Sequence, residues 1–184
     1  MNTKIIVIVG PTSTGKTELA KALQESLLPK VWLHFSVDSL IYSLPDSVLA
    51  ICNNDDDWAG VDGPLLFRSA ISCLRTLALE GNSVIFDLVI PNEKKTKELD
   101  ETLAGLDALI VELTCDWEEI KKRTIGRGDR TITEAERSFN TKFKTLRVDV
   151  TFDTTRASPS EISDQVRSLL RDKIGEQYSA GNVG

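Results

Sequence analysis

A glycine-rich segment near the amino terminus carries the strongest chemical signal in the sequence. It follows an apolar run at residues 5–9, which predicts a short buried strand, and it precedes a helical pattern that begins at residue 17. Glycines in the segment permit backbone angles that let successive N–H groups point at a phosphate. Its residues are Gly10, Pro11, Thr12, Ser13, Thr14, Gly15, Lys16 and Thr17. Their order predicts a phosphate-binding P-loop.

Two side chains of this segment would act on a bound nucleotide. Lys16 would reach the β- and γ-phosphates of ATP, and the Thr17 hydroxyl would ligate Mg²⁺. The positive end of the following helix would add to the attraction for phosphate. The alternative is a glycine-rich turn with a chance lysine, but the strand before it and the helix after it favour the P-loop. ATP and Mg²⁺ are therefore the expected ligands.

A carboxylate follows the second predicted strand. Residues 31–37 are largely apolar and β-prone, and Asp38 comes directly after them. The carboxylate is therefore expected at the carboxyl edge of the sheet, where ligands of open α/β sheets bind. From there Asp38 could orient or deprotonate a hydroxyl group. The alternative is that Asp38 caps a short helix at residues 39–43.

A second carboxylate ends another apolar strand. Residues 83–87 run Ser-Val-Ile-Phe-Asp, which is the Walker B pattern. At that place Asp87 would hold the Mg²⁺ shell or position a catalytic water. The alternative is that Asp87 only caps the end of the strand, because Asp is common in turns.

Three arginines and two threonines complete the set of candidate binding residues. Arg123, Arg127 and Arg130 stand in a segment broken by glycines, which predicts a mobile lid over the phosphates at about residues 123–135. The alternative is a solvated basic turn, because exposed arginine is ordinary. Thr154 and Thr155 follow the last predicted strand, which places them near the adenine.

The remaining pattern predicts one α/β domain. Apolar runs predict five strands, at residues 5–9, 31–37, 83–87, 108–113 and 148–153. Helices are expected at residues 17–27, 39–43, 64–80, 91–103, 116–124, 134–145 and 160–174, with a polar loop at 46–63. Strands that alternate with helices predict a doubly wound, five-stranded parallel sheet. The domain would span residues 1–175, with a flexible tail at 176–184.

Composition excludes several other classes of protein. The net charge is −6, with no basic track, which argues against a nucleic-acid partner. No apolar run is long enough to span a bilayer, and no signal peptide precedes the P-loop. The three cysteines have no metal-ligand or disulfide spacing, which fits the cytoplasm. The sequence makes no prediction about oligomeric state.

Several separated motifs together resemble the chloramphenicol phosphotransferase family of P-loop kinases. The resemblance covers nearly the whole chain, and its motifs lie at residues 10–17, 32–41, 63–68, 84–87, 127–130 and 148–155. It implies a fold similar to nucleoside monophosphate kinases and adenylylsulfate kinases. It also implies ATP-dependent phosphorylation of a small-molecule hydroxyl, such as that of a chloramphenicol-like antibiotic or a related metabolite. The resemblance implies that Asp38 faces the acceptor hydroxyl as a base and that Arg127 and Arg130 lie over the phosphates.

The sequence departs from this family's pattern in three places. Leu88 stands where the family often has a second acid, and Phe143 stands where it tends to have a histidine. The expected acceptor segment, at about residues 42–63, also differs. Two alternatives therefore stay open. One is a kinase of another acceptor, such as a nucleoside, sugar or aminoglycoside, and the other is a nucleotide-binding switch without catalysis.

Overall fold

The computed structural model describes residues 5–55, 60–127, 131–141 and 146–180. The five strands are β1 Ile5–Val9, β2 Leu33–Ser36, β3 Val84–Leu88, β4 Ala108–Thr114 and β5 Val150–Asp153. The described helices are α1 Lys16–Ser26, α2 Val37–Ile41, α3 Asp46–Asp55, α4 Gly63–Leu79, α5 Glu93–Leu103, α6 Trp117–Arg127, α7 Ile132–Asn140 and α8 Pro159–Ala180.

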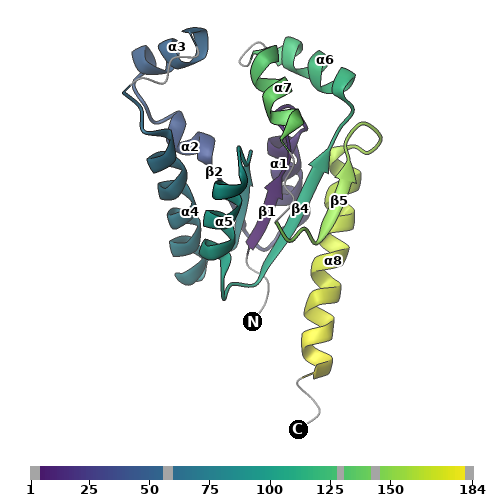
Figure 1. The fold of residues 1–184 in the computed structure, drawn as a ribbon. Helices are drawn as coiled ribbons and strands as arrows, with labels where there is room; N and C mark the ends of the chain where they lie inside the picture. The colour runs from purple at the N-terminus through teal and green to yellow at the C-terminus, as the bar shows by residue number, and fades with distance from the viewer. Residues whose placement is uncertain (1–4, 56–59, 128–130, 142–145, 181–184) are drawn as a thin grey trace.

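The strands form a single sheet in the order β2-β3-β1-β4-β5, and every neighbouring pair is parallel. The predicted doubly wound α/β fold is therefore confirmed. The carboxyl ends of the strands meet at one edge, which is the upper edge of the sheet in Figure 1. Because β1 occupies the middle of the sheet, the loop that follows it opens at the centre of this edge.

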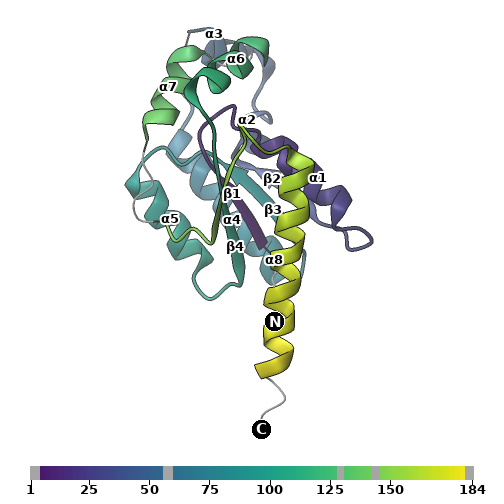
Figure 2. The ribbon, with the colours of Figure 1, turned by 90° about the vertical axis from the view of Figure 1, so that its right-hand side faces the viewer.

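Helices cover both faces of the sheet (Figures 1 and 2). One core cluster joins α4 and α5 to a face that includes Val7 and Val9, and the other joins α1 and α8 to a face that includes Ile6 and Ile8. Alternate residues of β1 thus point to opposite layers, and all five are buried. Burial on both faces explains why the inner strands read as continuous apolar runs.

Three helices stand above the carboxyl edge. The helices α6 and α7 lie together on one side, and α3 lies on the other side (Figure 1). A small core of Cys115, Ile120 and Ala135 joins α6 to α7, and the rings of Trp117 and Phe139 pack 5.4 Å apart between their centroids. The sheet edge is therefore flanked by two helical projections.

The helix α3 corrects one prediction, because residues 46–63 were expected to form a loop. Asp46 lies in the first turn of α3, where a carboxylate is favourable, and Cys52 is buried. The apolar residues Val48, Leu49 and Cys52 recur at helical spacing, but the surrounding polar residues hide this short pattern. Residues 56–59, which include Trp58, lie outside the described part of the chain.

Several other boundaries differ from the prediction. The helix α6 ends at Arg127 and not at residue 124, and α7 ends at Asn140 and not at residue 145. The second strand ends at Ser36, and Val37 already belongs to α2. A reciprocal cap sets this boundary, because the Ser36 hydroxyl accepts a 3.1 Å hydrogen bond from the Ser39 amide while the Ser36 amide donates to the Ser39 hydroxyl. The last helix continues through Ala180, beyond the predicted end at residue 174.

Gly10 is required where β1 passes beside the end of β4. Its φ is +153°, and an added Cβ would lie inside contact distance of the Leu113 backbone oxygen. We expect Gly10→Ala to lower the free energy of unfolding by about 3 kcal/mol or more, because the clash adds to the backbone strain. Urea denaturation followed by circular dichroism measures this loss.

Gly105→Ala is the matched control for this prediction. Gly105 also has a positive φ, of +76°, but a Cβ there would meet open space. We expect a loss of about 1 kcal/mol, from the backbone strain alone. Equal losses in the two variants would show that the contact with Leu113 does not matter.

Candidate active site

The P-loop residues form a tight turn at the head of α1. Gly15 precedes the helix in a left-handed conformation, with φ of 89°, and Ser13 also has a positive φ, of 60°. Ser13, Thr14 and Lys16 are buried, whereas Thr17 is exposed in the first turn of α1. The first amides of a helix have no intrahelical partner, so they can bind an anion. The segment therefore has the backbone shape and polarity that a phosphate requires.

The Lys16 side chain folds back over this turn. Its Nζ donates a 2.7 Å hydrogen bond to the Pro11 carbonyl oxygen, and the Thr14 hydroxyl donates to the same oxygen at 2.8 Å. Only 8% of Lys16 is exposed. The ammonium group is thus held at the P-loop, where a phosphate would meet it.

Hydroxyl groups of α6 and α7 hold the P-loop from above. The Thr12 amide donates a 2.9 Å hydrogen bond to the Ser138 hydroxyl, and the hydroxyls of Thr124 and Ser13 lie 2.8 Å apart. Sequence reasoning missed Ser138 and Thr124, because nothing in their local pattern marks a contact with so distant a segment. These contacts show that both helices around the expected lid are docked on the phosphate loop.

A cavity of about 200 Å³ lies beside the P-loop, and most of its lining is apolar. Arg123 of α6 forms part of its wall. The Arg123 guanidinium donates a 2.9 Å hydrogen bond to the Thr154 carbonyl oxygen and a 3.0 Å hydrogen bond to the Glu119 carboxylate. The structure thus brings the predicted residues Arg123 and Thr154 together beside Gly15. The lining residues are Thr14, Gly15, Glu18, Leu19, Arg123, Thr154, Ala157, Pro159 and Ile162.

Charge and hydrogen bonding fix the wall of this cavity. The hydrogen bond from Arg123 holds the pKa of Glu119 below its ordinary value, so both groups are charged at neutral pH. The Thr155 hydroxyl instead accepts a 2.8 Å hydrogen bond from the Asp116 amide at the start of α6. Thr155 therefore joins β5 to α6 and is not among the residues that line the cavity.

Of the two other predicted lid arginines, the structure describes Arg127 and not Arg130. Arg127 is exposed at the end of α6, one helical turn after Arg123, so both arise from the same side of the helix. Arg130 lies outside the described residues, as does Phe143.

Asp38 lies just beyond the carboxyl end of β2, in the first turn of α2, and is half-buried. The prediction that it directly follows the strand is wrong by one residue, because Val37 lies between Ser36 and Asp38. Ser36, and not Asp38, caps α2, so the alternative role as the helix cap is also corrected. Because β3 separates β2 from β1, Asp38 stands two strands away from the strand that leads into the P-loop.

Asp87 lies near the end of β3, beside Ile8 of the P-loop strand, and only 5% of it is exposed. The alternation of side chains places it on the same face as Ile85, which packs against α1. Its Oδ2 lies 2.8 Å from Nε2 of His34 on β2. Sequence reasoning missed this contact, because the two residues lie on different strands.

The donor set fits Mg²⁺ that is shared with a nucleotide. Within the described residues, no three His, Cys, Asp or Glu side chains group so as to hold a metal ion by themselves. Mg²⁺ in nucleotide sites is usually held by one or two protein oxygen ligands together with phosphates and water. A hydroxyl at Thr17 and a carboxylate at Asp87 are ligands of this kind.

A family model described as chloramphenicol phosphotransferase-like protein matches residues 3–171. The chain belongs to this family. The predicted family is therefore confirmed, and membership of the chloramphenicol phosphotransferase-like family identifies the chain as a phosphotransferase of the P-loop kinase type. Comparison with curated protein sequences finds no match.

Solved structures share the fold of this chloramphenicol phosphotransferase-like protein. A candidate kinase from Chloroflexus aurantiacus is 20% identical, with a TM-score of 0.70 over 94% of this chain and 98% of that chain. The APS kinase of Mycobacterium tuberculosis, solved with AMPPNP and APS, is 16% identical, with a TM-score of 0.67 over 92% and 98%. Shikimate kinase from Acinetobacter baumannii is 15% identical, with a TM-score of 0.62 over 93% and 94%. At these identities the likeness shows the fold alone.

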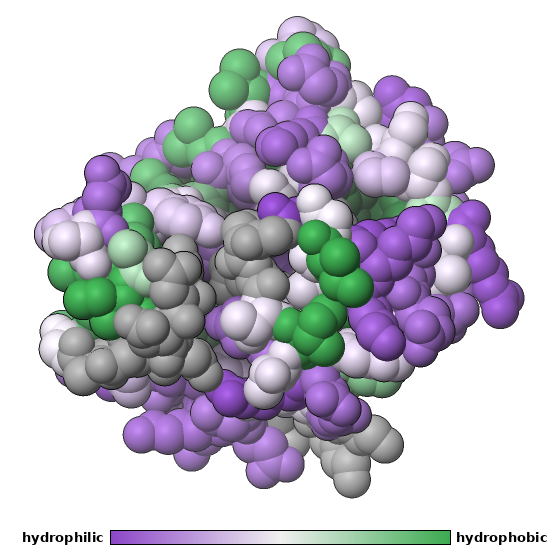
Figure 3. Space-filling view, turned by 90° about the horizontal axis from the view of Figure 1, so that it is seen from above, coloured by the Kyte–Doolittle hydropathy of each residue, from purple (hydrophilic) through white to green (hydrophobic). Residues whose placement is uncertain are grey.

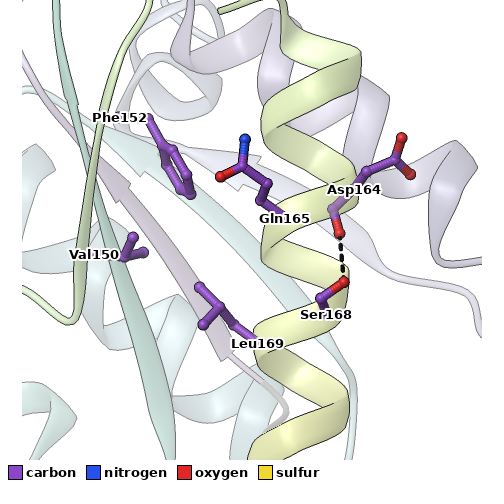
Figure 4. Close-up of a pocket in the computed structure, with 6 residues that line it drawn as sticks. All are labelled: Val150, Phe152, Asp164, Gln165, Ser168 and Leu169. Carbon is purple, nitrogen blue, oxygen red and sulfur yellow. Dashed lines mark hydrogen bonds between the residues drawn. The ribbon is translucent and has the colours of Figure 1, made fainter.

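Figure 3 looks down on the carboxyl edge, where most visible residues are hydrophilic. A wider hollow, of about 450 Å³, lies between β5 and α8, with Phe152 on the strand and Leu169 on the helix (Figure 4). It contains no P-loop residue. No helix among the described residues is long and apolar enough to cross a bilayer.

Proposed function

We propose that the protein transfers the γ-phosphate of ATP to a hydroxyl group of a small molecule. The observation that carries this proposal is that the P-loop with Lys16 and the carboxylate of Asp38 occupy one edge of the sheet, with a single strand between them. Neighbouring strands lie about 4.8 Å apart, so two strand positions give about 10 Å. That separation leaves room for a phosphoryl group and an acceptor oxygen.

Each candidate residue has a defined task in this reaction. The P-loop amides and Lys16 bind the phosphates, and Arg127 and Arg130 neutralise the moving phosphoryl group. Thr17 and Asp87 hold Mg²⁺ directly or through water, and the ion supplies further charge neutralisation. Asp38 accepts the proton of the acceptor hydroxyl, whose oxygen bonds to the γ-phosphorus while the bond to the β–γ bridging oxygen breaks and ADP leaves.

For the acceptor we propose a chloramphenicol-like antibiotic or a related hydroxylated metabolite, and a kinase of another acceptor remains the second candidate. Leu88 is buried against the α4 and α5 layer, on the opposite face from Asp87. The absence of an acid at that position therefore leaves the face of the candidate metal ligand unchanged. This supports a catalytic role over the non-catalytic switch.

The nucleotide base is proposed to enter the cavity beside Gly15. We expect Arg123→Ala to raise the Kd for ATP about tenfold, because one charge-assisted hydrogen-bonding group is lost and Thr154 loses its support. Isothermal titration calorimetry measures this change. Lys122→Ala is the matched control, because Lys122 also pairs with Glu119 from α6 but is exposed and outside the cavity. A wild-type Kd for ATP in Arg123→Ala would show that the nucleotide base does not bind in this cavity.

The experiment that tests the function uses mass spectrometry on a panel of hydroxylated acceptors. The protein is incubated with ATP, Mg²⁺ and chloramphenicol, nucleosides, sugars or aminoglycosides. A gain of one phosphate on an acceptor, with a matching amount of ADP, supports the proposal and names the acceptor class. Tight ATP binding without any acceptor-dependent turnover, on this panel and on cell metabolites, would favour the nucleotide-binding switch instead.

A further inference from the structure

The single histidine of the chain makes a partly buried contact with a candidate metal ligand. His34 Nε2 lies 2.8 Å from Asp87 Oδ2, which is hydrogen-bonding distance. The side chains are 20% and 7% exposed, respectively. A carboxylate that is removed from water needs a hydrogen-bond donor, and within the described residues His34 is the donor for Asp87.

The register of the sheet produces this contact. On β2, His34 is the direct neighbour of Ile85, and Ser36 is the direct neighbour of Asp87. His34 therefore reaches Asp87 diagonally across the strand pair, on the face that packs against α1. The P-loop helix begins on this same face, so the histidine and the candidate metal ligand lie behind the phosphate site.

Hydrogen bonding to one carboxylate oxygen restricts the rotation of the whole group. An ionised carboxylate only accepts, so Nε2 carries the proton in this contact. Oδ2 is then held by His34, and Oδ1 is the oxygen that His34 does not engage. Partners behind a metal ligand orient it in this manner, and their loss typically lowers metal affinity about 10- to 100-fold.

We propose that His34 is a positioning residue that orients the Asp87 carboxylate toward the divalent cation of the nucleotide complex. The inference rests on the proposed function, because it takes Asp87 as part of the Mg²⁺ shell. A purely structural role for His34 would leave the cation affinity unchanged in a folded variant. A positioning role lowers the cation affinity while the metal-free affinity for the nucleotide stays the same.

The test measures binding of Mn²⁺, a paramagnetic substitute for Mg²⁺, to the complex of the protein with the β,γ-imido analogue of ATP. Electron paramagnetic resonance counts the free Mn²⁺. His34→Phe keeps a flat ring without the donor, and we expect the Kd for Mn²⁺ to rise about tenfold. His34→Gln can place an N–H near the position of Nε2, and we expect it to stay within about twofold to threefold of wild type.

Controls separate this inference from the function on which it rests. The Kd of the analogue without metal, from calorimetry, should be unchanged in both variants. Asp87→Asn should weaken Mn²⁺ binding, and adding His34→Phe to it should weaken binding no further. If His34→Phe does not fold, His34→Asn, whose amide is shorter, takes its place with the same expected loss.

Several results would overturn the inference. The first is wild-type Mn²⁺ affinity in folded His34→Phe or His34→Asn, and the second is a folded His34→Gln that loses as much affinity as His34→Phe. Both leave the proposed function intact. The third is wild-type Mn²⁺ affinity in Asp87→Asn, which would show that Asp87 is not part of the metal shell. Failure of the wild-type protein to bind the nucleotide at all would overturn the proposed function and this inference together.

Discussion

Replacement of Lys16 by alanine is expected to abolish phosphoryl transfer, with kcat/KM reduced about a thousandfold or more. The ammonium group is held at the P-loop by the Pro11 carbonyl and is almost fully buried, so water cannot replace its charge efficiently. Phosphoryl transfer depends on positioning and on charge neutralisation more than on covalent chemistry. Single preorganised hydrogen-bond donors are typically worth about 10²–10³-fold, and a cationic group that stabilises a moving phosphoryl group is worth about 10³–10⁵-fold.

The same variant should also bind ATP at least about tenfold more weakly, because in the proposed function Lys16 binds the phosphates before the reaction begins. Lys21→Ala is the matched control: Lys21 lies on the same helix, but it is exposed and pairs with Glu18. Coupled-assay kinetics with the acceptor found by mass spectrometry, together with calorimetry for ATP, measure both effects. Retained turnover in Lys16→Ala would mean that the P-loop does not deliver the phosphate.

Replacement of Asp38 by alanine is expected to lower kcat about a thousandfold while the Kd for ATP stays within about twofold. General base catalysis contributes about 10²–10⁴-fold, and Asp38 stands two strands away from the P-loop strand, on the proposed acceptor side. This separation of turnover from nucleotide binding distinguishes Asp38→Ala from Lys16→Ala. Single-turnover kinetics and calorimetry with ATP give the two quantities.

Ser36→Ala is the control for a merely structural effect at this place. It removes the cap of α2 but leaves the carboxylate of Asp38. We expect it to cost about 1 kcal/mol of stability and to keep most of kcat. If Asp38→Ala keeps full turnover on the true acceptor, or if Ser36→Ala loses as much as Asp38→Ala, the carboxylate is not the base.

The sequence predicted the sheet well because its inner strands are buried on both faces. Continuous apolar runs such as residues 5–9 and 84–86 reflect that burial directly, and the P-loop motif depends on local backbone geometry. The boundary of β2 was harder, because Val37 continues the apolar run and only the reciprocal contacts of Ser36 and Ser39 turn the chain into a helix.

The missed parts of the candidate site depend on contacts between distant segments. The pairing of His34 with Asp87 requires both the strand order and the register, because a shift by one residue would turn His34 to the other face. The contact of Ser138 with Thr12 requires the docking of α7 on the P-loop. Neither can be deduced from local periodicity, whereas the motif residues around Lys16 can.

The first and last helices of the described fold share the wall of the cavity beside the P-loop. Leu19 of α1 and Ile162 of α8 both line it, and they belong to the same core cluster. A chain that stops short of α8 would keep the complete P-loop motif and yet lack one side of the compartment beside it. During translation the P-loop is made early, but the cavity beside it is complete only when α8 has left the ribosome.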